Sequence, residues 1–460
     1  MKKVVSFQNK TILVLGLARS GMSAAKLLKQ LGAFVVINDL TPLAENEIAQ
    51  NLQADGFTVI TGEHPLSLFT NYNFDFVVKN PGIPYTNVML KEASKLKIPI
   101  LTEVELAWYI SEAPIVGITG TNGKTTTTMM LHEILNHYKE NYSVLSGNIG
   151  YPASTVAQNV TADQILTMEL SSFQLMGIDK FCPHIAIITN IYDAHLDYHT
   201  DRAEYVAAKY AIQKNMTANN QLILNYNQAE VVALAEITKA DVYYFARNNT
   251  VRGAYDLEQK IYFNDEYIMD VNELSLPGEH NLENALAAIV ASKLLEVPTD
   301  VIRKVLMNFE GVPHRMQYVG RHNGVAYYND SKATNILATK KALSGFDKHN
   351  LILIAGGLDR DVDFSELSAD LIGLKGMVTF GETRTKLYNT AKALGIKVEM
   401  VEDVAEAARL ASQWAEENDN ILLSPANASW DQYPNFEMRG EHFIQAVKNL
   451  IEEQLNESYD

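Results

Sequence analysis

Residues 114–128 decide the fold, and their sequence is PIVGITGTNGKTTTT. The apolar, β-branched run at 115–118 is typical of a buried strand, and Gly120 and Gly123 follow it. From Lys124 onward, apolar residues recur at helical spacing. This order of strand, glycine turn and helix predicts a phosphate-binding loop. Its backbone N–H groups and the helix N-terminus would face the phosphates, with Lys124 at the outer phosphates and Thr125 at Mg²⁺.

The loop departs from the strict pattern G-x-x-x-x-G-K-S/T, because Ile118 stands where the first glycine belongs. The alternative is a glycine-rich turn with an incidental lysine. A Lys-Thr pair directly after a strand favours a nucleoside triphosphate over that alternative.

Length and composition bound the class of protein. The 460 residues suggest about three domains, and 47% hydrophobic with 20% charged residues is typical of a globular protein. The net charge of −17 argues against sequence-independent binding of nucleic acid or an anionic membrane. A single cysteine, Cys182, excludes an intrachain disulfide and fits a reducing cytoplasm. No apolar run reaches the roughly eighteen residues of a membrane span, and no signal core precedes Lys10, so a cytoplasmic location is expected.

The first segment begins with a predicted strand–helix–strand unit at 10–39. Its turn resembles a dinucleotide fingerprint, but Ala18 replaces the middle glycine, and Asp39 ends the second strand. NAD, a glycine needed only for packing, and another diphosphate ligand with Asp39 near its ribose or base all remain open. A later strand ends in the sequence KNPG at 79–82, which predicts exposed N–H groups at a ligand-binding sheet edge.

The second segment adds acidic and basic candidates to the phosphate loop. Glu169 ends an apolar strand, where a second Mg²⁺ contact is expected. His195 and His199 are four residues apart, which fits either a zinc pair or, preferably, one histidine beside Mg²⁺ and phosphate. Lys209 lies in a helical stretch and by itself predicts a solvated charge. An antiparallel hairpin is expected over 253–269.

The third segment again alternates strands and helices, and polar loops at 329–335, 355–360 and 424–431 follow its strands. They predict a second binding face. The fold class is therefore α/β with three domains: a Rossmann-like domain at 1–111, a central parallel sheet of the phosphate-loop ATPase type at 112–310, and a Rossmann-like domain at 311–460.

Several motifs occur in an order that resembles the Mur ligases, ATP-dependent amide-forming enzymes of peptidoglycan synthesis. They are TGTNGKT (119–125), GNIG (147–150), ELSSFQ (169–174), HN (280–281), PHR (313–315) and DSKATN (330–335). The resemblance spans essentially the whole chain, although folylpolyglutamate synthases share the phosphate loop. The stretches NDSKATN (329–335), SPANASWDQY (424–433) and NFEMRG (435–440) are similar to the family member that adds D-glutamate.

This resemblance implies a reaction in two steps. The carboxylate of UDP-N-acetylmuramoyl-L-alanine would attack the γ-phosphate of ATP, and the amine of D-glutamate would then displace phosphate from the acyl phosphate. Because a carboxylate must approach a triphosphate, charge compensation by two Mg²⁺ ions and a lysine is expected. The resemblance also implies a monomer that binds neither nucleic acid nor membrane.

The resemblance also assigns roles to residues, group by group. The catalytic group is Lys124, Asn148, His195 and Lys209. The ATP group is Gly120, Thr121, Asn122, Gly123, Lys124, Thr125, Thr126, Thr127, Asn281, Asn284, Arg315 and Asp330. The metal group is Thr125, Glu169, His195 and Lys209, the last as a carbamate. The UDP-substrate group is Ala18, Arg19, Ser20, Asp39, Asn80, Gly82, Asn148 and Ser171. The D-glutamate group is His314, Lys332, Thr334, Arg360, Ser429 and Phe436.

Two departures from the family pattern stand out. Ala194 precedes His195 where related chains often have Asp, and Arg360 stands where other members carry Lys, with Asp359 shifted by one place.

Three alternative functions stay open at this point: a ligase for another amino acid or for folate, an NAD-linked oxidoreductase built on 16–39, and a regulatory nucleotide-binding module. The oxidoreductase leaves the loop at 117–125 unexplained, and the module would not need the polar loops of the third segment.

Overall fold

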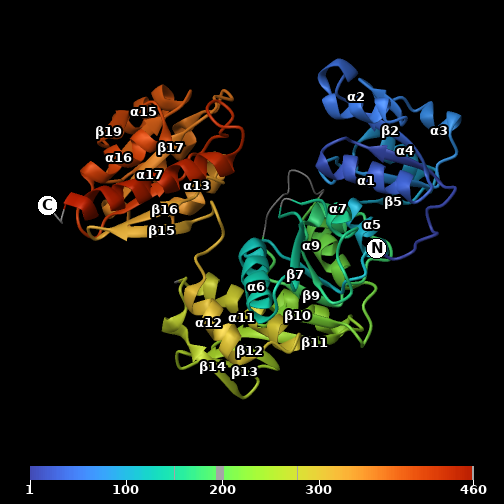
Figure 1. Ribbon diagram of the computed structural model, residues 1–460, viewed down its shortest axis with the longest axis horizontal. Coiled ribbons are helices and arrows are strands. Elements are labelled where there is room, and N and C mark those ends of the chain that lie inside the picture. The colour runs from blue at the N-terminus through green and yellow to red at the C-terminus, as the bar shows by residue number, and fades with distance from the viewer. Residues whose placement is uncertain (150, 193–200, 277, 458–460) are drawn as a thin grey trace. The chain divides into compact units, whose positions relative to one another are not determined.

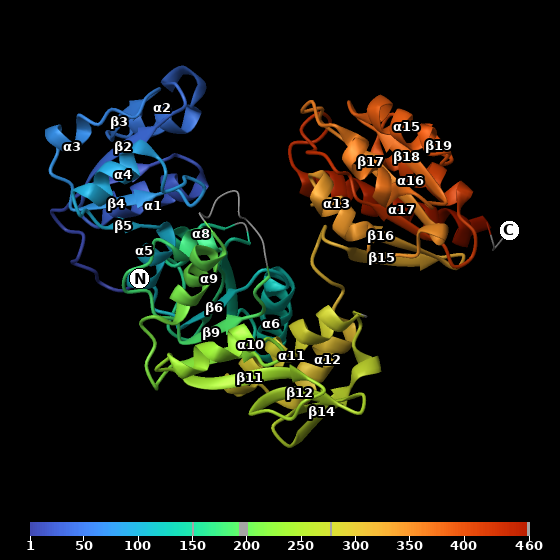
Figure 2. The ribbon, with the colours of Figure 1, turned by 180° about the vertical axis from the view of Figure 1, so that it is seen from behind.

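The computed structural model describes residues 1–149, 151–192, 201–276 and 278–457. The chain forms two compact units, Met1–Phe309 and Glu310–Asp460, drawn from opposite sides in Figures 1 and 2. Within the described residues, the first unit holds a five-stranded and a nine-stranded sheet, and the second holds a six-stranded sheet. No helix in this part of the chain is long and apolar enough to cross a membrane.

The first sheet is parallel throughout, in the order β3-β2-β1-β4-β5. Its strands are β1 (Thr11–Leu15), β2 (Phe34–Asp39), β3 (Thr58–Thr61), β4 (Phe76–Lys79) and β5 (Ile100–Leu101). Its helices are α1 (Arg19–Gln30), η1 (Leu43–Glu45), α2 (Glu47–Ala54), α3 (Leu68–Asn71), α4 (Val88–Lys95) and α5 (Glu103–Ile110). The chain leaves β1 toward β2 and β3 and returns to β4 on the other side, so the switch point where such sheets bind ligands lies between β1 and β4.

The central sheet runs β14-β13-β12-β11-β10-β9-β6-β8-β7 and is parallel from β7 to β12. Its strands are β6 (Ile115–Thr119), β7 (Ser143–Gly147), β8 (Ile165–Glu169), β9 (Ile185–Ile188), β10 (Gln221–Asn225), β11 (Asp241–Arg247), β12 (Gly253–Leu257), β13 (Lys260–Phe263) and β14 (Glu266–Asp270). Antiparallel pairing of β12 with β13, and of β13 with β14, confirms the hairpin expected over 253–269.

The helices of this sheet are α6 (Lys124–Tyr138), α7 (Ala153–Val156), α8 (Ser172–Leu175), α9 (Arg202–Tyr210), η2 (Ala211–Gln213), α10 (Ala229–Val232), η3 (Ala233–Glu236), η4 (Val271–Glu273), α11 (Glu279–Leu294) and α12 (Thr299–Asn308). Both views show α11 beside α6, and the two helices pack on each other. This packing brings residues far along the chain next to the helix that starts at Lys124.

Helix α5 joins the first sheet to the central one. Buried side chains of α1, α5 and residues 153–178 form one hydrophobic core. The carboxylate of Glu105, on α5, accepts hydrogen bonds from the backbone N–H groups of Asp179 (2.9 Å), Lys180 (2.7 Å) and Phe181 (3.0 Å). The expected boundary near residue 111 therefore lies inside one compact unit, and separate domains at 1–111 and 112–310 stay a prediction.

The second unit has the strand order β15-β16-β20-β17-β18-β19, antiparallel only between β15 and β16 among the described strands. Its strands are β15 (Gln317–His322), β16 (Val325–Asn329), β17 (Leu351–Gly356), β18 (Gly376–Phe380), β19 (Val398–Met400) and β20 (Asn420–Leu423). Its helices are α13 (Ile336–Leu343), η5 (Lys348–Asn350), η6 (Phe364–Leu367), α14 (Ser368–Leu371), α15 (Arg384–Ala393), α16 (Val404–Trp414) and α17 (Phe436–Glu457). The sequence prediction of an α/β fold with mainly parallel sheets is confirmed.

Candidate active site

The loop between β6 and α6 requires glycine at two positions. Gly120 has φ +145° and Gly123 has φ +79°, values that other residues rarely adopt. A Cβ at 120 would lie 1.9 Å from the hydroxyl oxygen of Thr189, and one at 123 would lie 2.1 Å from Oδ1 of Asn284. The loop is thus pressed between the end of β9 and helix α11, which explains its spacing of glycines.

The residues that follow β9 hold this loop in place. The side chain of Asn190 accepts a hydrogen bond from Asn122 N (2.8 Å), and its carbonyl accepts one from Thr121 N (2.8 Å). The hydroxyl of Thr121 lies 2.9 Å from that of Tyr205. Sequence reasoning did not single out Asn190 or Tyr205. Only the position of Asn190, directly after an apolar strand, gave a signal for it.

Two lysines converge on one carbonyl of the loop. Lys124 Nζ donates to the carbonyl oxygens of Gly120 (2.9 Å) and Thr121 (2.9 Å). Lys209 Nζ donates to the same Gly120 oxygen (2.7 Å) and lies 4.6 Å from the ring of Tyr205. Only 2% of Lys209 is exposed, so the prediction of a solvated charge is wrong. Because helix α9 packs against the loop, the neighbours that bury this side chain are distant in sequence.

Burial shifts the titration of Lys209. Its pKa falls from the ordinary 10.5 to about 6, mainly because burial penalises the charged form and secondly because Lys124 is positive, while Glu169 opposes the shift. Burial therefore favours the neutral form of this amine near pH 7. A neutral lysine amine, unlike the ammonium, has a lone pair that can act as a nucleophile.

Asn148 and Glu169 form a pair beside the loop. Asn148 donates to Glu169 through its side chain (2.7 Å to Oε1) and its backbone (2.8 Å to the carbonyl). The other carboxylate oxygen of Glu169, Oε2, is buried and has no hydrogen-bond partner in the described part of the chain. A buried carboxylate oxygen without a donor is costly, and a cation would compensate it. The observed site therefore fits the predicted Mg²⁺ contact.

Helix α6 presents the other loop residues. Thr125 and Thr127 are buried in its first turn, Thr126 is half-buried, and the Thr127 hydroxyl lies 3.3 Å from Oδ1 of Asn284. Asn281 and Asn284 are three apart on α11 and thus share one helix face.

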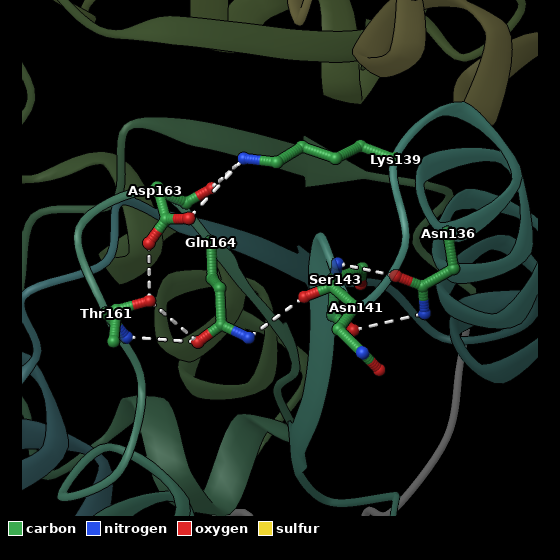
Figure 3. Close-up of polar contacts among 7 residues, drawn as sticks. All are labelled: Asn136, Lys139, Asn141, Ser143, Thr161, Asp163 and Gln164. Carbon is green, nitrogen blue, oxygen red and sulfur yellow. Dashed lines mark hydrogen bonds and ion pairs between the residues drawn. The ribbon is translucent and has the colours of Figure 1, made fainter.

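The far end of α6 is tied to β7 by polar contacts (Figure 3). The side chain of Asn136 accepts from Ser143 N (2.8 Å) and donates to Ser143 O (3.2 Å), and Gln164 donates to Asn141 O (2.9 Å). This network fixes the turn into β7, the strand that leads to Asn148.

Other predicted site residues either have a local structural role or lie outside the described residues. Ser171 caps helix α8 in a reciprocal pair with Gln174, so its hydroxyl already has a local partner. His195, Ala194 and the alternative zinc pair with His199 lie outside the described residues. Among those that are described, no group of three or more His, Cys, Asp or Glu converges to hold a metal.

At the switch point of the first sheet, the predicted substrate residues gather. The Asp39 carboxylate accepts from Leu17 N (2.7 Å), and Asn80 donates to the Ser20 hydroxyl (3.2 Å) and accepts from Gly82 N (3.0 Å). Ala18 occupies the N-cap position of helix α1 without a side-chain hydrogen bond, and Arg19 is the first residue of that helix. The structure thus brings residues from the ends of β1, β2 and β4 together.

Lys79 supports this site, although the sequence did not single it out. It is buried at the end of β4, and its ammonium donates to the carbonyls of Pro81 (3.1 Å) and Ile83 (2.8 Å). Burial lowers its pKa to about 7. Because it donates to two carbonyls of the loop that holds Asn80 and Gly82, Lys79 stabilises the conformation of that loop.

In the second unit, several predicted residues are neighbours. Lys332 N donates to His314 O (3.0 Å), Lys332 Nζ lies 5.5 Å from the ring of Phe436, and the rings of His314 and Phe436 are 6.2 Å apart. Thr334 N donates to Lys332 O (2.9 Å). Asp330 accepts from the Ser424 hydroxyl (2.9 Å), and burial raises its pKa to about 7. Arg315 and Asp330 belong to this unit, and their contact with ATP stays a prediction.

Arg439 fixes this group, and the sequence did not mark it as a site residue. It is fully buried and donates to the hydroxyl (3.0 Å) and carbonyl (2.8 Å) of Ser331 and to Gly356 O (3.3 Å). The hydroxyl of Ser429 is buried without a hydrogen-bond partner among the described residues. The Arg360 guanidinium carbon lies 4.9 Å from the centre of the Trp430 ring.

Comparison with known proteins agrees with this geometry. Residues 118–292 match the family model "Mur ligase middle domain", and residues 314–427 match "Mur ligase, glutamate ligase domain". The chain is 58% identical to the UDP-N-acetylmuramoylalanine--D-glutamate ligase of Enterococcus faecalis, over 99% of this chain and 100% of that one. It is 54% identical to the enzyme of the same name from Listeria monocytogenes, over 98% and 99% of the two chains.

Solved structures support the fold at lower identity. The UDP-N-acetylmuramate-alanine ligase of Thermotoga maritima has a TM-score of 0.53 at 18% identity and covers 96% of this chain and 99% of its own. A MurF structure from Acinetobacter baumannii has a TM-score of 0.56 at 17% identity, covering 96% and 92%. Because two family models and full-length relatives above 50% identity agree, the chain belongs to the Mur ligases.

Proposed function

We propose that this protein is a cytoplasmic, ATP-dependent ligase that joins D-glutamate to UDP-N-acetylmuramoyl-L-alanine during synthesis of the peptidoglycan precursor. The names of its full-length relatives support this substrate pair. The observation that carries the proposal is the convergence of Lys124, Lys209 and Glu169 at the loop around Gly120. Such a loop can hold a triphosphate while a carboxylate approaches it.

In the first step, a carboxylate oxygen of the alanyl group attacks the γ-phosphorus of ATP, and the bond to ADP breaks. Repulsion between these anions must be offset, and Lys124 with the N-terminus of α6 supplies positive potential there. Asn148, held against Glu169, lies beside the loop with an amide that can orient the attacking carboxylate. Gly120 to Thr127 and the α11 residues Asn281 and Asn284 form the ATP side of the site.

The residues also suit two Mg²⁺ ions. Glu169 Oε2 and the Thr125 hydroxyl would hold one, and a carbamate on Lys209 with His195 would serve the other. Bound Mg²⁺ would neutralise charge shared by phosphate and carboxylate oxygens. The carbamate forms when the neutral Lys209 amine attacks CO₂, which makes an N–C bond and releases one proton. The low pKa of Lys209 supports this modification at neutral pH.

In the second step, the amine of D-glutamate attacks the acyl carbon, phosphate leaves, and the amine loses a proton. The residues proposed to bind D-glutamate are His314, Lys332, Thr334, Arg360, Ser429 and Phe436. Their cations suit the two carboxylates of the amino acid. In this proposal residues 1–111 bind the UDP end of the substrate, residues 112–310 bind ATP and residues 311–460 bind the amino acid. The protein would act as a monomer.

An amino-acid panel tests the function. Phosphate release is measured with ATP, Mg²⁺ and UDP-N-acetylmuramoyl-L-alanine while D-glutamate, L-glutamate, L-lysine or diaminopimelate is added. Only D-glutamate is expected to accelerate release and to yield an amide product. Faster release with another member of the panel, and none with D-glutamate, would reassign the amino-acid substrate.

A further inference from the structure

Trp430 is an exposed tryptophan in an otherwise polar loop. Its exposed fraction is 65%, whereas the adjacent Ser429 is only 1% exposed. Its indole therefore offers a large aromatic face to a neighbouring side chain or ligand. The guanidinium carbon of Arg360 lies 4.9 Å from the centre of the Trp430 ring, within the range of a cation–π contact.

The loops that carry the two residues are joined to each other. Leu358 N donates to Ala428 O (2.9 Å), which pairs the backbones just before Arg360 and Trp430. Glu382 bridges the same loops, because its carboxylate accepts from Asp359 N (3.0 Å) and its backbone N–H donates to Asp431 (3.1 Å). The Arg360–Trp430 contact therefore rests on anchored backbone and is not a meeting of two free side chains.

The charges around this pair leave Arg360 available. Asp359 is already paired with Lys386, whose Nζ donates to it at 2.9 Å. Arg360 itself forms no ion pair with an acid in the part of the chain that is described, and it is exposed. A guanidinium that contacts an aromatic ring and has no acidic partner in the described residues still has N–H groups that can bind a carboxylate.

A shallow surface depression, wide open to solvent, is lined by Trp430, Asp431, Gln432, Tyr433 and Pro434. The hydroxyl of Ser429, one residue before this lining, is buried and without a hydrogen-bond partner among the described residues. A buried polar atom without a partner marks a place where a polar ligand or water is wanted. The unpartnered Ser429 hydroxyl and the ring that Arg360 contacts therefore belong to consecutive residues.

We infer that Trp430 is a positioning residue for amino-acid specificity: its ring holds the Arg360 guanidinium for bidentate contact with a carboxylate of the incoming amino acid. This inference rests on the proposed function. The ammonium of a lysine is a compact charge on a flexible side chain, whereas the guanidinium of an arginine is planar and can bind both oxygens of a carboxylate. Contact with an indole can orient the guanidinium before the carboxylate binds.

Kinetics of Trp430→Leu test the inference. The KM for D-glutamate is expected to rise roughly two- to thirtyfold, the fold-change equivalent of a cation–π contact. Saturating D-glutamate should restore kcat, and the KM values for ATP and UDP-N-acetylmuramoyl-L-alanine should not change. Trp430→Phe keeps an aromatic face and should fall between the wild type and the leucine variant. Preference for D-glutamate over D-glutamine should fall in the leucine variant.

A double-mutant cycle shows whether Trp430 acts by positioning Arg360 or by contacting the substrate itself. If Trp430 acts through Arg360, Arg360→Met combined with Trp430→Leu should be no worse than Arg360→Met alone. The matched control is Lys397→Met, because Lys397 lies 4.1 Å from the ring of Trp414 in a second cation–π pair of the same unit. This control should leave the KM for D-glutamate at the wild-type value.

Three results would overturn the inference: an unchanged KM for D-glutamate in Trp430→Leu, additive effects in the cycle, or equal rises in the KM of all three substrates. Thermal unfolding of each variant is recorded in parallel, and the exposed position predicts an unchanged Tm. If the wild type shows no D-glutamate-dependent phosphate release, the proposed function fails instead, and the two failures are therefore distinguishable.

Discussion

At the scale of single residues, Lys209 shows what a sequence pattern can and cannot reveal. Its helical surroundings gave no sign of burial, and only family resemblance marked it. In the structure its amine is buried, lies against the carbonyl of Gly120 and has a pKa of about 6. Burial of a long side chain depends on neighbours distant in sequence, so no local periodicity could predict it.

The lowered pKa predicts a pH dependence of stability. Between pH 6 and 10.5 the unfolded chain binds a proton at Lys209 that the native chain does not, so this residue makes the free energy of unfolding increase with pH. The slope approaches about 1.4 kcal/mol per pH unit. Methionine at position 209 does not titrate, so Lys209→Met should have a larger free energy of unfolding than the wild type at pH 7. The difference in free energy between the two proteins should shrink toward pH 10. Urea unfolding at several pH values measures it, with CO₂ excluded and metal absent. Parallel stability curves for the two proteins would contradict the assignment.

The carbamate proposal makes a second prediction for the same residue. Lys209→Ala should lose nearly all ligase activity, because an anionic ligand for Mg²⁺ is missing. Short carboxylates such as acetate or formate should restore part of it by occupying the vacated space. Phosphate release is the measurement, and chloride at equal ionic strength is the control. Full activity of the alanine variant without an additive would exclude the role.

At the scale of elements, the phosphate loop was predictable because its signal is local. Strand β6, the glycines and the start of α6 follow one another without a gap, so their pattern could be recognised directly. The contacts of the loop with Asn190 and Asn284 have no local signal, since these residues reach it from the end of β9 and from α11, and only the family resemblance pointed to Asn284. The same holds for Arg439, whose partner Ser331 lies more than a hundred residues away, whereas Lys79 donates to carbonyls within four residues of itself.

The close approach of Asn284 to Gly123 predicts that position 123 requires glycine. Gly123→Ala places a Cβ 2.1 Å from Asn284 Oδ1 at φ +79°, so the loop must move. A misplacement of this size should lower kcat/KM for ATP by about a hundredfold. Gly62→Ala is the matched control, because φ is +88° there but no atom lies within 4 Å. It should retain activity and lose about 1 kcal/mol of stability.

Steady-state kinetics with ATP varied, together with urea unfolding, distinguish the two glycine variants. Equal activity loss in both would mean that backbone strain, and not the contact with Asn284, is responsible. Normal ATP turnover in Gly123→Ala would contradict the assignment of this loop to ATP.

At the scale of the whole molecule, the alternation of strands and helices predicted three α/β sheets and the positions of the polar loops. It did not predict that the first two sheets form one compact unit. That union depends on α5, where Glu105 accepts three backbone hydrogen bonds and Trp108 donates to Cys182 O (2.9 Å). These contacts join residues more than seventy positions apart, beyond the reach of periodicity.

The first two sheets, which form one compact unit, carry the residues of two proposed substrate sites. The loops around Asp39 and Asn80 and the loop around Gly120 belong to one unit, Met1–Phe309. The proposed uridine-diphosphate site and the proposed site of carboxylate activation therefore share a common core. The proposed D-glutamate residues belong to the other unit, Glu310–Asp460.

The loop at 120–127 is proposed to activate a carboxylate by phosphorylation. Isotope transfer tests it directly, with UDP-N-acetylmuramoyl-L-alanine labelled with oxygen-18 in the alanine carboxylate. Complete turnover with ATP and D-glutamate is predicted to move one labelled oxygen into the released phosphate, because that oxygen bridges carbon and phosphorus in the acyl phosphate. Formation of the amide with unlabelled phosphate would contradict the claim.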